Sequence, residues 1–195
     1  DTGDLGYSTD AEDNVMPLTY LVQALSPALK KTDPNYQPGM EPGDFRFKNS
    51  PVPLVKGAAG FLFQQAKFRR QWVEWAPKEQ GGGIQKRHDE EPKDVKLANG
   101  KMFAPNGNEI VDTRYHTGIV RVGDVSFPTV IPFKVTGLTV SKNWNTDMFL
   151  RKKPDGRKYH STELIYHLTA GERTNPKGSW FQVVPTFSRY ATPEE

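Results

Sequence analysis

Cysteine is absent from the 195 residues of the sequence. This absence excludes a disulfide framework, a thiolate zinc site and a cysteine nucleophile. Hydrophobic residues are also few, at 35%, and no apolar run approaches the roughly 18 residues that span a bilayer. The opening is acidic and polar and has no signal-peptide pattern. Together these absences predict a cytoplasmic protein.

Motifs that announce catalysis are missing as well. The sequence has no His-Glu-x-x-His, no Gly-x-Ser-x-Gly and no Gly-x-x-x-x-Gly-Lys-Ser/Thr. Glu91–Lys93 and Asp94–Lys96 resemble the acidic-x-Lys part of a nuclease motif, but they lie in a charged loop region. We therefore expect no enzyme, no cofactor and no metal site. A metal-dependent nuclease is the least favoured alternative, since clustered carboxylates on strands would be needed to hold the metal.

Charge is distributed unevenly along the chain. The net charge is +3, from 26 Lys and Arg against 23 Asp and Glu. Residues 1–15 hold five of the acids and no base, so the rest of the chain has 26 bases against 18 acids. A basic body of this kind favours a polyanionic partner.

Turn formers and charge runs divide the chain into segments. Residues 1–15 are expected to form a flexible acidic arm and 191–195 a short tail, on either side of one β-rich domain over 16–190. Within that domain, 32–57 is rich in Pro and Gly and predicts an extended irregular segment. Residues 78–108 predict a long loop with room for a short hairpin.

The regular elements are predominantly strands. Strand patterns cover 61–63, 68–75, 109–116, 118–122, 125–134, 159–169 and 180–187, with Gly118 as a bulge or bend and Pro128 and Pro132 indicating an edge or bulged position. The apolar run at 16–25 fits either a short helix or a strand. One helix is predicted from Thr136 to about Leu150. The sum is a mainly β, β-rich α+β fold: a small OB-like Greek-key barrel with one helix and long loops, or alternatively a β-sandwich.

Basic residues interleaved with aromatic rings are the strongest chemical signal. Single-stranded nucleic acid needs cations for its phosphates and flat rings on which unpaired bases stack. The interpretation as a core ring is favoured for Trp72, and the two interpretations are balanced for Trp144 and Tyr159. The candidate nucleic-acid-binding residues are Arg69, Arg70, Trp72, Lys142, Trp144, Arg151, Lys152, Lys153 and Tyr159.

Several segments together resemble a known class of protein. They are Ser26–Lys30 with Pro38-Gly39 and Gly43-Asp44, Trp72–Trp75 with Gly81–Gly83, Glu109–His116, Ser141–Asn145 and Lys177–Phe181. The sequence resembles single-stranded DNA-binding proteins of tailed bacteriophages, which are built on an OB fold and act in replication and recombination. The resemblance implies sequence-independent binding of single-stranded DNA in a basic groove with base stacking, and phage replication or recombination proteins as partners. In many such proteins the acidic tail is C-terminal, whereas here the larger acidic stretch is N-terminal; we expect this arm to cover part of the basic groove.

A second hypothesis for the function remains open. Extended Pro/Gly segments and an aromatic-rich β domain also suit a phage structural or assembly protein without a nucleic-acid role.

Overall fold

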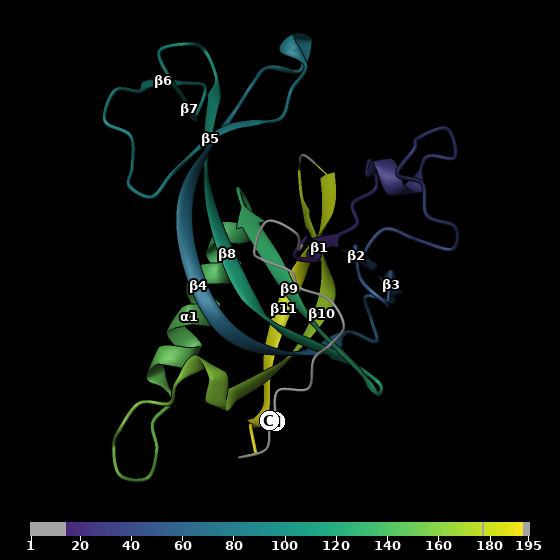
Figure 1. Ribbon diagram of the computed structural model, residues 1–195, viewed down its shortest axis with the longest axis vertical. Coiled ribbons are helices and arrows are strands. Elements are labelled where there is room, and N and C mark those ends of the chain that lie inside the picture. The colour runs from purple at the N-terminus through teal and green to yellow at the C-terminus, as the bar shows by residue number, and fades with distance from the viewer. Residues whose placement is uncertain (1–14, 177, 193–195) are drawn as a thin grey trace, which may run out of the picture.

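Five long strands and one helix form the framework of the computed structural model, which describes residues 15–176 and 178–192. The long strands are β4 (Phe61–Trp75), β8 (Glu109–Val122), β9 (Val125–Lys134), β10 (Leu164–Asn175) and β11 (Gly178–Tyr190), and the helix is α1 (Gly137–Leu150). They are hydrogen-bonded in the order β11-β10-β4-β8-β9. Figure 1 shows the sheet curling into a half-barrel, and α1 packs on it beside β9 and β11.

Short strands extend this framework at both ends. They are β1 (Leu18–Leu21), β2 (Phe45–Lys48), β3 (Leu54–Val55), β5 (Ile84–His88), β6 (Lys96–Ala98) and β7 (Lys101–Phe103), with single 3-10 turns at Pro27–Leu29, Lys78–Gln80 and Ser161–Glu163. The eleven strands of the described residues belong to one sheet. The predicted mainly β fold with one helix is therefore confirmed, and the single curled sheet is consistent with the predicted small barrel.

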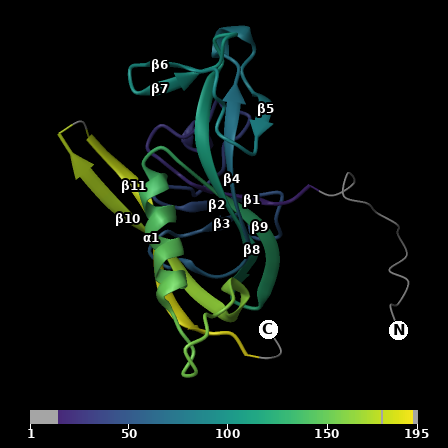
Figure 2. The ribbon, with the colours of Figure 1, turned by 90° about the vertical axis from the view of Figure 1, so that its left-hand side faces the viewer.

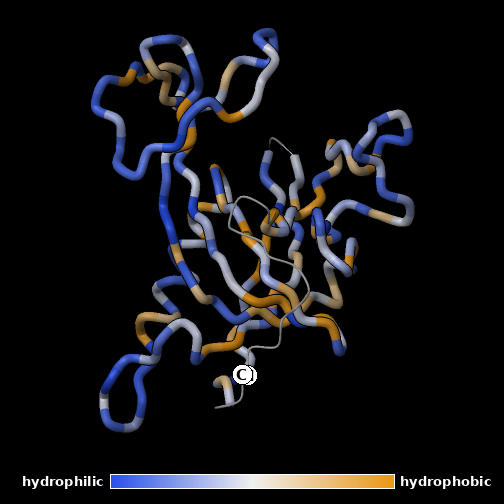
Figure 3. Tube along the Cα trace, viewed as in Figure 1, coloured by the Kyte–Doolittle hydropathy of each residue, from blue (hydrophilic) through white to orange (hydrophobic). Residues whose placement is uncertain are grey.

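Aromatic side chains fill the barrel. Phe61 packs edge-on against Phe45 and Phe47, with ring centroids 4.9 and 5.0 Å apart. The helix contributes Val140, Ser141, Trp144 and Met148 to the interior. Figure 3 shows hydrophobic residues gathered in the barrel, while the loop after α1 is mainly hydrophilic.

A polar group lies in the middle of this core. His116 is fully buried, and its ring stacks on Trp144 with centroids 4.5 Å apart and planes 6° apart. Its Nε2 lies 2.8 Å from Ser141 Oγ, and its Nδ1 is hydrogen-bonded to Gln65 Oε1. Burial, aided by the nearby charge of Arg114, lowers the pKa of His116 from 6.5 to about 3. The imidazole is therefore neutral at neutral pH.

Strands β4 and β8 are longer than their sequence pattern indicates. Gly118 does not interrupt β8, which is one strand of 14 residues, but the bulge predicted there is present where β8 pairs with β4. The irregularity lies in its partner, between Gln65 and Lys67. A Cβ atom at position 118 would lie 2.2 Å from the Gln64 carbonyl oxygen, so glycine at this position permits the two backbones to approach.

The two prolines of β9 have a related explanation. β9 is not the predicted edge strand, because it lies between β8 and β1. Its pairing with β1 is limited to Leu18 and Val130, and Val130 N–H donates to the Pro17 carbonyl at 2.9 Å. Pro128 and Pro132 are two residues either side of Val130, so their nitrogens face the β1 side, where no other ladder bond is required of them.

Buried hydroxyl groups fix how β1 sits against β9. The Thr129 hydroxyl donates to the Pro17 carbonyl at 3.0 Å, and the Thr19 and Thr129 hydroxyl oxygens are 2.8 Å apart. Both threonines are almost fully buried. The run at 16–25 thus contains a strand, one of its two predicted forms.

The predicted loop regions contain more structure than expected. Segment 32–57 carries β2 and β3, and 78–108 carries β5, which pairs with β4, and the hairpin of β6 and β7. Ala104 of the latter segment packs in a small separate core with Trp72 of β4 and Ile110 of β8. Residues 1–14 of the expected acidic arm at 1–15, and the acids Glu194 and Glu195, lie outside the described residues.

Candidate nucleic-acid interface

The tryptophans of the predicted site are buried. Trp144 is 2% exposed, between the rings of Phe63 and His116, and Trp72 is 7% exposed. Trp72 is also covered by the Arg70 guanidinium, 4.2 Å from its ring centroid. As a correction to the predicted site, these two indoles are core side chains and present no free face for a base.

Most of the predicted cations already have a carboxylate partner. Their ion pairs are Arg69–Asp89 at 2.7 Å, Arg70–Asp112 at 2.9 Å, Arg151–Asp147 at 2.9 Å and Lys153–Glu163 at 2.5 Å. A cation that is neutralised in this way attracts a phosphate less strongly. Lys142 and Lys152 are exposed, with no ion pair to another described residue.

Tyr159 is half-buried and stacks on Tyr190, with ring centroids 4.4 Å apart. It belongs to the region that follows α1, whereas Arg69, Arg70 and Trp72 lie on β4. Within the described part of the chain, no hydrogen bond, ion pair or ring contact joins these two groups. The structure therefore does not assemble the predicted residues into one site.

The strand register instead brings together a different set. Residues directly opposite each other on paired strands point to the same face of a sheet. Pairing across β4, β8, β9, β1 and β2 places five residues in one row, namely Arg69, Tyr115, Pro132, Tyr20 and Arg46. Here Tyr20 is opposite Pro132 because the parallel pair of Leu18 and Val130 lies two residues earlier on both strands. The row carries a cation at each end and two tyrosine rings between them.

The neighbouring rows add further cations to the same face. One row begins with Lys67 and ends with Lys48, and the other carries Lys134 opposite Thr113. We call this surface the cation–tyrosine face; its members are Tyr20, Arg46, Lys48, Lys67, Arg69, Tyr115 and Lys134. Arg46, Lys48, Lys67 and Lys134 form no ion pair with any described carboxylate.

A cation lies near each of the two tyrosines. Arg87 of β5 donates to the Tyr115 hydroxyl at 2.7 Å, and its guanidinium lies 5.8 Å from the centroid of that ring. Tyr20 is 42% exposed. Partial burial raises the pKa of Tyr20, with the Arg46 charge acting in the opposite direction, so the phenol is neutral at neutral pH. The Tyr20 ring is thus an uncharged surface beside the positive charge of Arg46.

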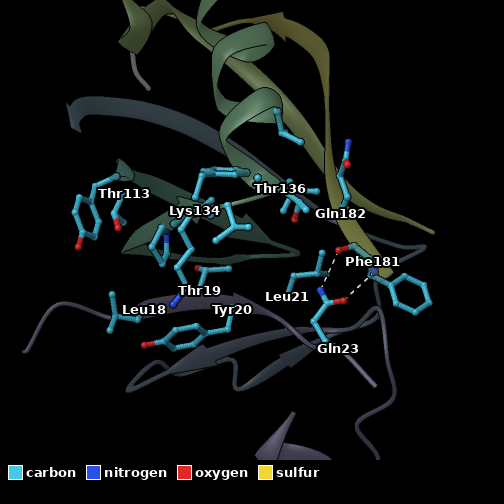
Figure 4. A pocket seen from close by; sticks show the side chains of 18 of the residues that line it. Leu18, Thr19, Tyr20, Leu21, Gln23, Thr113, Lys134, Thr136, Phe181 and Gln182 are labelled. Atoms are coloured by element: carbon cyan, nitrogen blue, oxygen red, sulfur yellow. Dashed lines mark hydrogen bonds between the residues drawn. The ribbon is translucent and has the colours of Figure 1, made fainter. Parts of the chain in front are cut away.

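A cleft of about 660 Å³ adjoins this face. It lies where β1 and the end of β9 face β11 and the first turn of α1 (Figure 4). Apolar and aromatic side chains form most of its wall, including Leu18, Trp75, Val140, Trp180 and Phe181. Lys134 and Arg87 also line it, and no Asp or Glu is among its described lining residues.

One side chain links the two sides of the cleft. The Gln23 amide Nε2 donates to the Phe181 carbonyl at 2.9 Å, and its Oε1 accepts the Phe181 N–H at 2.9 Å. These two bonds reproduce the pattern of a neighbouring strand. Gln23 therefore joins the end of the β1 segment to the outer edge of β11, where the described strands form no ladder.

Among the described residues, the cleft is not accompanied by a cluster of metal-ligating side chains. The part of the chain that the structure describes contains no group of three or more His, Asp or Glu side chains arranged to hold an ion. In the same residues, no helix is long and apolar enough to cross a membrane.

These observations describe a small, partly open β-barrel with a basic, tyrosine-bearing face. The chain belongs to the family of Pam3 phage gp34-like proteins, whose model matches residues 1–195. It is therefore a bacteriophage protein. Neither the curated proteins nor the solved structures contain a match.

The sequence does contain a pattern that indicates the cation–tyrosine face. Arg46-Phe47-Lys48 and Lys67-Phe68-Arg69 both alternate cation, phenylalanine, cation. In a strand this alternation directs both cations to one face and the ring to the other. Tyr20 and Tyr115 carry no comparable signal, since only the pairing of β1 with β9 and β8 with β9 places them together.

Proposed function

We propose that this phage protein binds single-stranded DNA without sequence preference, in replication or recombination in the cytoplasm of the infected cell. It acts as a binding module rather than an enzyme. The observation that carries the proposal is the cation–tyrosine face, where two tyrosine rings lie among four cations, Arg46, Lys48, Lys67 and Lys134, that have no carboxylate partner in the described chain. Such a surface offers charge for phosphates and flat rings for unpaired bases.

The place of this face in the fold supports the same function. In OB folds, oligonucleotides contact the face of the second and third strands and the loops after the first and fourth strands. Counted along the framework, β8 and β9 are the second and third long strands, and they carry Tyr115 and Lys134. The segment after the first long strand supplies Arg87.

Fluorescence anisotropy of a labelled poly-dT oligonucleotide tests the proposal, with duplex DNA as competitor and several salt concentrations. We expect binding that falls steeply with salt, because counterions are released from the phosphates. Tyr20→Leu and Tyr115→Leu should each weaken binding by about 5- to 150-fold, the loss of one stacked base at roughly 1–3 kcal/mol.

Charge removal provides a matched comparison. Lys48→Gln and Lys67→Gln should each reduce the salt slope by about one. Lys142→Gln is the control, since Lys142 is also exposed without a described ion pair but lies on α1, away from the face. An equal loss in the control would place DNA on the helix instead, and no binding at low salt would refute the function.

One observation favours the assembly role as second candidate. Phe149 and Leu150, adjacent at the end of α1, are 59% and 66% exposed. Exposed large apolar side chains side by side are typical of protein contacts. A stable oligomer on size-exclusion chromatography, dissociated by Phe149→Ser and Leu150→Ser, together with absence of DNA binding, would support it.

A further inference from the structure

The cleft between β1 and β11 has the dimensions and lining of a ligand site. Its volume of about 660 Å³ falls within the range of roughly 300–1,000 Å³ that is usual for small-molecule pockets. Its wall is mainly apolar, and Trp75 and Trp180 are among the residues that line it. A flat, apolar group therefore fits the interior better than a charged or extended polar one.

Charge at the cleft has one sign. Lys134 and Arg87 line it, and the described lining residues include no carboxylate. The Lys134 ammonium lies 5.1 Å from the centroid of the Trp75 ring, so a cation and an aromatic wall are adjacent. A ligand that joins a flat ring to a negative charge matches both features.

The cleft and the cation–tyrosine face are continuous. Tyr20, Tyr115 and Lys134 are members of the face and also line the cleft. A strand held on the face thus passes the mouth of the cleft, where Lys134 can hold a phosphate.

The tryptophans of the cleft are not fully satisfied. The indole Nε1 atoms of Trp75 and Trp180 are buried and have no hydrogen-bond partner among the described residues. An unpaired buried donor is unfavourable.

We propose that the cleft takes one unstacked base of the bound strand, with the adjoining phosphate at Lys134. This inference rests on the proposed function and adds to it a second mode of contact: bases stack on the tyrosines of the open face, while one base is enclosed between β9 and β11. Gln23 holds the β11 side of the cleft in place through its two bonds to Phe181.

The four tryptophans of the chain allow a clean test. Trp75 and Trp180 line the cleft, whereas Trp72 and Trp144 do not. We would follow intrinsic fluorescence during titration with poly-dT in the wild type, the double variant Trp75→Phe/Trp180→Phe and the control Trp72→Phe. Anisotropy would measure affinity in parallel, and circular dichroism would verify folding.

If the cleft encloses a base, binding of poly-dT should strongly quench tryptophan fluorescence in the wild type and in Trp72→Phe. The double variant should lose this quenching but should still bind poly-dT through the cation–tyrosine face. Quenching that survives in the double variant overturns the inference. Crosslinking provides a second measurement that needs no substitution: 4-thiothymidine in the oligonucleotide should form adducts with Trp180 or Phe181 of β11, which is not part of the face. Adducts confined to Tyr20 and Tyr115 would also overturn it.

The test distinguishes failure of the proposed function from failure of the proposed cleft site. If the wild type binds poly-dT but shows neither quenching nor β11 adducts, the face binds DNA and the cleft does not. If the wild type does not bind poly-dT at low salt, both proposals are refuted.

Discussion

Mild acid should destabilise the protein through His116. The folded state holds this imidazole neutral, with a pKa lowered by burial to about 3, whereas the unfolded chain titrates near the ordinary value of 6.5. Between these values the unfolded state binds more protons, so stability rises with pH. The stabilisation is complete above the unfolded value and is lost progressively as the pH falls from about 6.5 toward 3.

The size of the effect follows from the distance below the unfolded pKa. At about pH 5 the loss relative to neutral pH is roughly 2 kcal/mol, at about 1.4 kcal/mol for each pH unit. This pH is chosen because it lies above the ordinary values of Asp and Glu. The carboxyl groups with lowered pKa, such as Glu74 and Asp89, still contribute fully there.

Urea denaturation at about pH 7.5 and about pH 5 measures the difference. His116→Gln removes the titration while leaving a side chain that can hydrogen-bond in the same core. The variant should be less stable at neutral pH but should lack the roughly 2 kcal/mol loss on acidification. His160→Asn is the control, because His160 is exposed. If His116→Gln loses as much stability as the wild type between the two pH values, the assignment to His116 is wrong.

Two further predictions concern the backbone of the barrel. Gly118→Ala should cost at least about 2 kcal/mol in thermal unfolding, because its Cβ would meet the Gln64 carbonyl oxygen on the adjacent strand; Thr117→Ala on the same strand should cost less, and equal losses would contradict the steric argument. Gln23→Leu should cost about 1–3 kcal/mol by leaving the Phe181 N–H and C=O without their partner. Gln182→Leu, at a cleft residue with no described side-chain hydrogen bond, is its control in the same denaturation assay.

Much of the fold could be predicted from local pattern, because alternation and turn residues act over a few positions. The helix from Gly137 to Leu150 was identified in this way. The sequence indicated Gly118 as a bulge or bend but not the reason for it. Glycine at this position permits a close approach to Gln64, more than fifty residues earlier. The two prolines of β9 likewise depend on how little of β1 reaches that strand.

The candidate site was less predictable for a related reason. Clustering in sequence selected Trp144 and Arg151, but the first is in the core and the second is paired with Asp147. A local window shows neither the burial of a ring nor the partner of a charge. The cation–tyrosine face draws instead on five strands, and its members are adjacent only through the register.

Because the face depends on strand register, the contact between the Thr19 and Thr129 hydroxyl groups affects more than stability. A slip of one residue along a strand exchanges the two faces. Such a slip of β1 would turn Tyr20 toward the barrel interior and bring Thr19 outward. The pairing of β1 with β9 is too short to prevent such a slip alone. The buried contact between the two hydroxyl groups therefore fixes the register of β1 against β9. Two buried side chains thus decide which ring the protein presents at its surface.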